Sequence, residues 1–131
     1  MKIAVISDIH SNIYALDKVL EDIKSKNIDN IVCTGDLVGY GTRPNEVINR
    51  LREEKILTIM GNYDEAIGNF KFICGCDYPD PNDAQKSALS MQFTSQETSD
   101  INKEYLRNLP NELTFNFENK TIRFVHGRQE L

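Results

Sequence analysis

The chain is poor in cysteine and histidine and contains no tryptophan: its 131 residues include three cysteines and two histidines. An odd number of cysteines without a secretory leader argues against a disulfide framework and indicates reduced thiols in a cytoplasmic protein. Cys33 stands in an apolar stretch and is expected in the core. Cys74-Gly75-Cys76 has no second cysteine or histidine pair nearby, so it lacks the four ligands of a structural zinc site.

Long apolar runs and clusters of basic residues are also missing. No stretch reaches the roughly 18 apolar residues that a membrane span requires, so no membrane partner is expected. The formal net charge is -5, and no Lys/Arg cluster offers a basic face, so general nucleic-acid binding is not expected. Composition is that of a globular protein, and the length predicts a single domain over residues 1–131.

The most informative stretch that is present is Lys2–His10, with the sequence KIAVISDIH. Its β-branched apolar residues predict a buried central strand of a parallel sheet. The stretch ends in a carboxylate, Asp8, and an imidazole, His10. If the backbone stays extended after Ser7, residues i and i+2 point the same way, and these two side chains could hold one metal ion.

Strand-loop-helix units follow one another in the first half of the chain. Apolar residues at helical spacing predict a helix over 12–26. Short apolar runs predict strands over 31–34 and 56–60, with a helix starting at Pro44 between them. This succession predicts an α/β fold with a parallel sheet and right-handed crossovers.

The second half of the chain predicts a long loop followed by two helices and a β-hairpin. Residues 68–83 have no periodicity and are rich in turn-forming residues, so we expect a functional loop there. The hairpin leads directly into His126. The expected ranges of these helices and strands are 84–94, 99–109, 113–117 and 122–125.

Side chains that can bind metal follow four of the predicted strands. They are Asp8 and His10, Asp36, Asn62, and His126. Because the carboxyl ends of parallel strands share one edge of the sheet, we expect these side chains to meet. Two carboxylates, two imidazoles and an amide oxygen suit Mn²⁺, Fe, Ni²⁺, Zn²⁺ or Mg²⁺. The neighbouring Gly35, Gly61 and Gly127 allow close backbone approach.

Each of these residues also has a purely structural interpretation. Asp36 could shape a turn, Asn62 could adopt a left-handed turn conformation, and His126 could be a hydrogen-bonded histidine at a strand end. Their joint placement at one sheet edge favours a metal site. A nucleotide-binding fold is not favoured, because the turn after the first strand has no glycine and Gly35–Gly41 lacks the ending of a P-loop.

Four short blocks resemble the ordered signature of calcineurin-like metallophosphoesterases, in particular their small bacterial and archaeal phosphodiesterase branch. The blocks are Asp8-Ile9-His10, Gly35-Asp36-Leu37-Val38-Gly39, Gly61-Asn62-Tyr63-Asp64 and Val125-His126-Gly127. They extend over nearly the whole chain. The resemblance implies a sandwich of sheets flanked by helices, of which this chain would lack the last strands.

For the site, the resemblance implies a centre of two divalent metal ions, with Mn expected first and Fe, Ni, Zn or Mg as alternatives. Asp36 would bridge the ions, Asp8 and His10 would bind the first, and Asn62 and His126 the second. A metal-activated water would attack the phosphorus of a small phosphate ester. The residues expected to contact that substrate are Asn62 and Arg43.

Two departures from the family pattern affect the expected activity. The family commonly has a histidine at the position of Tyr63, as a general acid or phosphate contact, with the acidic residue at Asp64 orienting it. A tyrosine donates a hydrogen bond at neutral pH but supplies no imidazolium, so we expect weaker acid catalysis. The family also completes its metal shells with a later Gly-His-x-His segment. We expect a C-terminally truncated chain or, alternatively, a degenerate member with weakened metal binding.

The sequence therefore predicts a metallophosphoesterase that hydrolyses small phosphodiesters or phosphomonoesters, with weak or no activity in this chain. The alternative is a non-catalytic metal- or nucleotide-binding regulatory module, a pseudoenzyme. Exposed strand edges are expected to favour a homo-oligomer.

Overall fold

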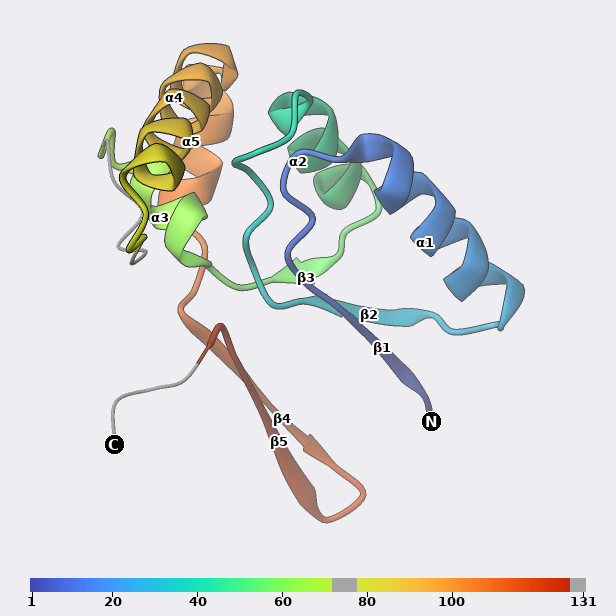
Figure 1. The fold of residues 1–131 in the computed structure, drawn as a ribbon. Coiled ribbons are helices and arrows are strands. Elements are labelled where there is room, and N and C mark those ends of the chain that lie inside the picture. The colour runs from blue at the N-terminus through green and yellow to red at the C-terminus, as the bar shows by residue number, and fades with distance from the viewer. Residues whose placement is uncertain (72–77, 128–131) are drawn as a thin grey trace.

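The chain folds into helices packed on a small parallel sheet, with a separate β-hairpin beside it (Figure 1). A computed structural model describes residues 1–71 and 78–127, so residues 72–77 of the predicted loop, with Cys74 and Cys76, lie outside the described residues. The elements are β1 (Ile3–Ile6), α1 (Ile13–Ser25), β2 (Asn30–Cys33), α2 (Pro44–Glu53), β3 (Leu57–Thr58), α3 (Asn62–Gly68), α4 (Pro81–Glu97), α5 (Asp100–Arg107), β4 (Glu112–Phe117) and β5 (Lys120–Val125).

The sheet has the strand order β1-β2-β3 with all strands parallel, which confirms the predicted α/β fold. Ile6 pairs with Cys33, and Cys33 pairs with Thr58. The carboxyl ends of the three strands are therefore aligned, and the loops that follow them start from one edge. The predicted hairpin is confirmed as the antiparallel pair of β4 and β5.

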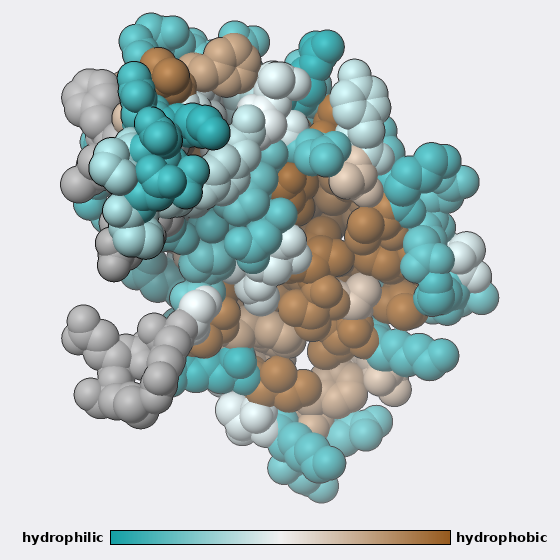
Figure 2. Space-filling model, in the orientation of Figure 1, coloured by the Kyte–Doolittle hydropathy of each residue, from teal (hydrophilic) through white to brown (hydrophobic). Residues whose placement is uncertain are grey.

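The predicted central position of β1 is wrong for the part of the chain that the structure describes. Only β2 pairs with it there, and Val5 is 54% exposed. Figure 2 shows a broad hydrophobic zone over β1 and the adjoining side of α1. An apolar run indicates that a strand seeks cover on both faces, but it does not specify which segments supply that cover.

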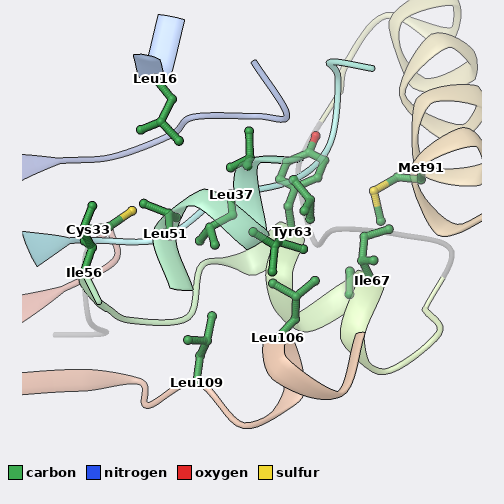
Figure 3. Close-up of a cluster of buried hydrophobic side chains, with 14 of the residues drawn as sticks. Leu16, Cys33, Leu37, Leu51, Ile56, Tyr63, Ile67, Met91, Leu106 and Leu109 are labelled. Carbon is green, nitrogen blue, oxygen red and sulfur yellow. The ribbon is translucent and has the colours of Figure 1, made fainter. Parts of the chain in front are cut away.

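The core connects the α1–α2 side of the molecule with the α3–α5 group (Figure 3). Cys33 is fully buried within it, as predicted. Leu37 and Val38, directly after Asp36, are also fully buried. Burying each of these aliphatic side chains contributes about 1.5–3 kcal/mol to folding. The loop that carries Asp36 is therefore fixed by its own core residues.

Two helices differ from the sequence prediction. The short helix α3 was not predicted, and it begins at Asn62 because the Asp64 side chain accepts a hydrogen bond from the Gly61 N–H at 2.9 Å. Helix α4 begins at Pro81 rather than at residue 84, since Asp80 caps its N-terminus and proline suits the first turn.

Candidate metal centre

Asp8 and His10 come together through a turn and not through an extended strand, which corrects the geometry expected from the sequence. Strand β1 ends at Ile6, and both residues have positive φ angles of 55° and 46°. The backbone N–H of Asp8 donates to Gly35 O at 2.9 Å, and that of His10 donates to Asp36 O at 3.0 Å. The loop after β1 therefore runs beside the loop after β2, and Asp8 Oδ1 lies 3.5 Å from His10 Nε2.

Asp36 stands between the two histidines of the chain. Its Oδ2 atom lies 3.7 Å from His10 Nε2 and 3.4 Å from His126 Nε2. The other carboxylate oxygen, Oδ1, accepts the Tyr63 backbone N–H at 3.0 Å. The side chain is only 5% exposed, and this burial raises the pKa of Asp36, against the opposing effects of that N–H and of the two imidazoles. One carboxylate is thus shared by two imidazoles.

Backbone carbonyls fix both imidazole rings. His10 Nδ1 lies 2.9 Å from Val38 O, and His126 Nδ1 lies 2.7 Å from Thr34 O. A carbonyl oxygen only accepts, so each Nδ1 carries the hydrogen of its bond. In a neutral ring the lone pair then sits on Nε2, which faces Asp36. This is how protein backbones commonly orient metal-binding histidines.

Acceptor atoms from several elements consequently gather in this region. Asn62, the first residue of α3, places Oδ1 3.1 Å from His126 Nε2. On the other side, ligand atoms of Asp8, His10 and Asp36 all lie within 4.8 Å of one another. Such a group can hold a cation, either a proton on a ring or a metal ion. The oxygen and imidazole donors fit the divalent ions predicted from the sequence.

Backbone conformations that are unusual for residues other than glycine are concentrated here. Ten such residues with positive φ occur in the described ranges, and five of them line this region: Asp8, His10, Ser11, Asp36 and Tyr40. Each costs free energy relative to ordinary backbone. Concentrated strain of this kind is typical of functional sites, where the surrounding structure holds it in place.

Asp64 binds the backbone of the loops that carry the metal-binding residues. It is fully buried, and its carboxylate accepts the backbone N–H groups of Asp36 at 2.8 Å, Leu37 at 2.9 Å and Gly61 at 2.9 Å. It therefore holds the loops that carry Asp36 and Asn62 together. Burial raises the pKa of the Asp64 carboxyl to about 7, although the three N–H donors favour the charged form.

The raised pKa of Asp64 predicts a pH-dependent stability of the metal-free chain. The folded chain holds a proton on Asp64 more tightly than the unfolded chain, in which the carboxyl has the ordinary aspartate pKa of about 3.9. The contribution of this group to the free energy of unfolding is therefore greatest below about pH 4 and decreases as the pH rises towards 7. Carbon-13 NMR of the carboxyl groups in the presence of EDTA should show one buried aspartate titrating near 7; a value near 4 for Asp64 would contradict this.

Tyr63 belongs to a cluster of phenols and does not face the open pocket. Its ring is 2% exposed and meets the His10 ring edge-on, with centroids 5.1 Å apart. Its hydroxyl lies 2.5 Å from the Tyr40 hydroxyl and 2.9 Å from that of Tyr78. Burial and these hydrogen bonds raise the pKa of Tyr63, so it stays neutral.

Tyr40 is the more exposed member of this cluster beside the metal-binding residues. It is 52% exposed and lines a pocket of about 600 Å³ together with Asp8, His10 and Arg43. The predicted substrate contact Arg43 thus lies in the same pocket as two predicted metal ligands. Sequence reasoning assigned no role to Tyr40 or Tyr78; the signal for Tyr40 was its place between Gly39 and Gly41, whereas Tyr78 carried none.

Gly61 leaves the space that the Asp36 carboxylate occupies. A Cβ atom at this position would lie 2.1 Å from Asp36 Oδ1 and 2.3 Å from the Asp36 backbone nitrogen. Gly61→Ala should therefore displace Asp36 and weaken Mn²⁺ binding about 10- to 100-fold, measured by isothermal titration calorimetry. Asp29→Ala, at an exposed position outside the site, is the control; equal affinities of wild type and Gly61→Ala would contradict the close packing.

In the described ranges, none of the helices is long and apolar enough to cross a membrane.

Comparisons with known proteins agree with the fold. The chain is 37% identical over 125 residues to an uncharacterized protein from Methanocaldococcus jannaschii, covering 95% of this chain and 49% of that protein. It resembles the crystal structure of a metallophosphoesterase from Sphaerobacter thermophilus with a TM-score of 0.65 and 32% identity, over 86% of this chain and 43% of that one.

A third similarity concerns the fold alone. A hypothetical protein from Pyrococcus horikoshii superposes with a TM-score of 0.69 at 24% identity, over 92% of this chain and 52% of that one. The chain therefore spans about half the length of the curated relative and of the solved structures it matches. The calcineurin-like phosphoesterase superfamily domain matches residues 1–131 in full, and the chain belongs to that family.

Proposed function

We propose that the chain carries the binuclear metal site of a phosphoesterase that hydrolyses small phosphodiesters or phosphomonoesters. The observation that carries this proposal is the position of Asp36 Oδ2, 3.7 Å from His10 Nε2 and 3.4 Å from His126 Nε2. One buried carboxylate shared by two oriented imidazoles is the arrangement that a bridging ligand requires. Membership of the phosphoesterase family supports the reaction class.

Five side chains would hold the two metal ions. Asp8 and His10 would hold one ion, Asn62 and His126 the other, and Asp36 both. Bound divalent ions would supply an activated water and neutralise charge on the phosphoryl group. Val38 O and Thr34 O keep the Nε2 atoms directed inward.

Two further residues would act beside the metal ligands, Arg43 on the substrate and Tyr63 on neighbouring side chains. Arg43 is a cation at the edge of the pocket and would bind a phosphate oxygen. Tyr63 has its hydroxyl within the phenol cluster, so it would act by placing Tyr40 and the His10 ring and not as a general acid.

A Mn²⁺-supplemented assay tests the proposal. The 131-residue chain is incubated with bis(p-nitrophenyl) phosphate and with p-nitrophenyl phosphate, and release of p-nitrophenolate is compared with that of Asp36→Asn. Turnover above the variant supports the enzyme. Calorimetric titration with Mn²⁺ is run in parallel, and a chain that neither binds the ion nor hydrolyses either ester contradicts the proposal.

A second candidate function is a metal-binding regulatory module without catalysis. It is favoured by Tyr63 at the position of the family histidine and by the presence of only two histidines, both already in the site. This alternative predicts Mn²⁺ binding without turnover, so the same pair of measurements separates the two functions. For the phosphoesterase, we also propose manganese as the natural ion and a cytoplasmic location.

We also propose that copies of this chain associate through β1. In the described residues β1 has one paired side, and Val5 on β1 and Val19 on α1 are 54% and 41% exposed. The hydrophobic zone in Figure 2 covers this region. An open strand edge beside apolar side chains favours pairing with a second chain.

Val5→Lys should therefore shift the chain towards the monomer. Sedimentation equilibrium is measured at concentrations from about 5 to about 100 µM. The mass should rise with concentration for wild type and stay near 15.0 kDa for the variant. Leu89→Lys, on an exposed position of α4, is the control for added charge. A wild-type chain that stays monomeric throughout would contradict the proposed association.

A further inference from the structure

The pocket beside the metal-binding residues has an outer part with its own chemistry. We call this part, lined by Asn12, Tyr14, Tyr40, Thr42 and Arg43, the outer groove. It is continuous with Asp8 and His10, and the whole pocket measures about 600 Å³. That size is within the range of small-molecule sites. A phosphate ester held at the metal centre would therefore extend one of its substituents into the outer groove.

Two exposed tyrosines line this groove. Tyr14 is 69% and Tyr40 is 52% exposed, and they are the two tyrosines with mainly exposed side chains in the described ranges. Tyr14 lies at the start of α1, whereas Tyr40 comes from the loop after β2. Aromatic rings at the entrance of a polar pocket offer stacking surfaces for planar ligands.

Tyr40 is held in place before any ligand arrives. Its backbone has a φ of 57°, and its N–H donates to Ser90 Oγ at 2.9 Å. The hydroxyl is bonded to those of Tyr63 and Tyr78, and the ring lies edge-on to His10 at 4.8 Å between centroids. A ring fixed in this way loses little conformational entropy when a ligand stacks on it.

The groove also contains polar groups suited to a phosphoryl group. The Arg43 guanidinium is 53% exposed, and its ion pair with Glu46 is long, at 3.8 Å. Ser11, another residue lining the pocket, has a buried hydroxyl with no hydrogen-bond partner in the described part of the chain. A buried polar group of this kind is unusual unless a ligand or water completes it.

From this geometry we infer that the outer groove binds the planar aromatic part of a phosphate ester, with Tyr14 and Tyr40 as the stacking residues and Arg43 on the phosphoryl group. The inference rests on the proposed function, since it concerns the substituent of the same ester. The aromatic part is either a nucleobase or a simple aryl group, which share this chemistry. A nucleic-acid polymer is not favoured, because the net charge is -5.

Binding without turnover tests the groove separately from catalysis. The full chain in EDTA is titrated by calorimetry with adenosine 5′-monophosphate, phenyl phosphate and ribose 5-phosphate, which share the phosphate monoester but differ in the aromatic part. We expect the adenosine and phenyl esters to bind about 10-fold more tightly than ribose 5-phosphate, as stacking on an aromatic ring predicts. A tighter adenosine ester indicates a nucleobase site, and equal affinities of the two aromatic esters indicate a simple aryl site.

Tyr14→Ala should remove the preference for the aromatic esters and leave ribose 5-phosphate unchanged. Ile101→Ala, at an exposed position of α5 outside the groove, should keep the preference. The inference is overturned if ribose 5-phosphate binds as tightly as the aromatic esters, if neither aromatic ester binds, or if Tyr14→Ala retains the preference. Because no metal or turnover is involved, these outcomes do not depend on whether the proposed phosphoesterase activity is found.

Discussion

Asp36→Asn is expected to weaken Mn²⁺ binding by at least about 100-fold and to reduce phosphoester hydrolysis to the background rate. Substituting residues that only hydrogen-bond to a metal ligand already changes metal affinity by about 10- to 100-fold. The neutral amide removes the negative charge that both imidazoles face and leaves a single acceptor oxygen. If that oxygen keeps the Tyr63 N–H now bound at 3.0 Å, an NH₂ group points at the Nε2 atoms of His10 and His126. That orientation excludes a cation from both sides of the site.

Calorimetric Mn²⁺ titration and the chromogenic assay measure this effect. The matched control is Asp29→Asn, which makes the same chemical change at an exposed residue away from the site. Circular dichroism should show that both variants retain the fold, because the Asp36 backbone N–H remains bonded to Asp64. A variant Asp36→Asn that binds the ion as tightly as Asp29→Asn would remove the bridging role from Asp36.

Asp64→Ala is expected to destabilise the chain by about 3–5 kcal/mol, since each buried N–H group left without an acceptor costs about 1–3 kcal/mol. Three backbone N–H groups, those of Asp36, Leu37 and Gly61, would lose their acceptor in a region that water does not reach. The cavity left by the carboxylate adds to this cost. Few other single substitutions in the described residues would affect both the Asp36 loop and the start of α3.

Urea unfolding followed by far-UV circular dichroism gives the free energy of unfolding. Asp64→Asn should fall between Asp64→Ala and wild type, because its amide oxygen still accepts from some of the three donors. Asp29→Ala, at an exposed position, should change stability by less than about 0.5 kcal/mol. If Asp64→Ala loses no more than this control, the carboxylate does not hold the two loops together.

Local patterns were sufficient to predict most of the elements and their order along the chain. Helix α1 and the hairpin follow from hydrophobic periodicity, and Pro44 marks the start of α2 as expected. The parallel sheet follows from the alternation of strands and helices. Helix α3 escaped prediction because its start depends on the Asp64 side chain bonding to Gly61, a contact that no periodicity reports.

The candidate site was predictable as a set of residues but not as a geometry. The positions of Asp8, Asp36 and Asn62 after successive parallel strands predicted that they would meet, because parallel strands end at one edge. His126 follows β5 of the separate antiparallel hairpin, so this rule does not account for its place in the site. Their orientation depends on long-range contacts: His126 Nδ1 reaches Thr34 O from 92 residues away. The positive φ angles of Asp8 and His10 replace the extended strand that a local reading predicts.

By itself, the sequence determined which chemical groups follow the strands, since the order of the strands along the chain and the hydrophobic periodicity are local properties. Only the tertiary structure decided that Asp36 lies between two imidazoles, that Tyr63 faces other phenols, and that β1 is an edge strand in the described residues. The physical reason is that hydrogen bonds to buried backbone groups and packing between distant segments set side-chain directions, and no local pattern records them.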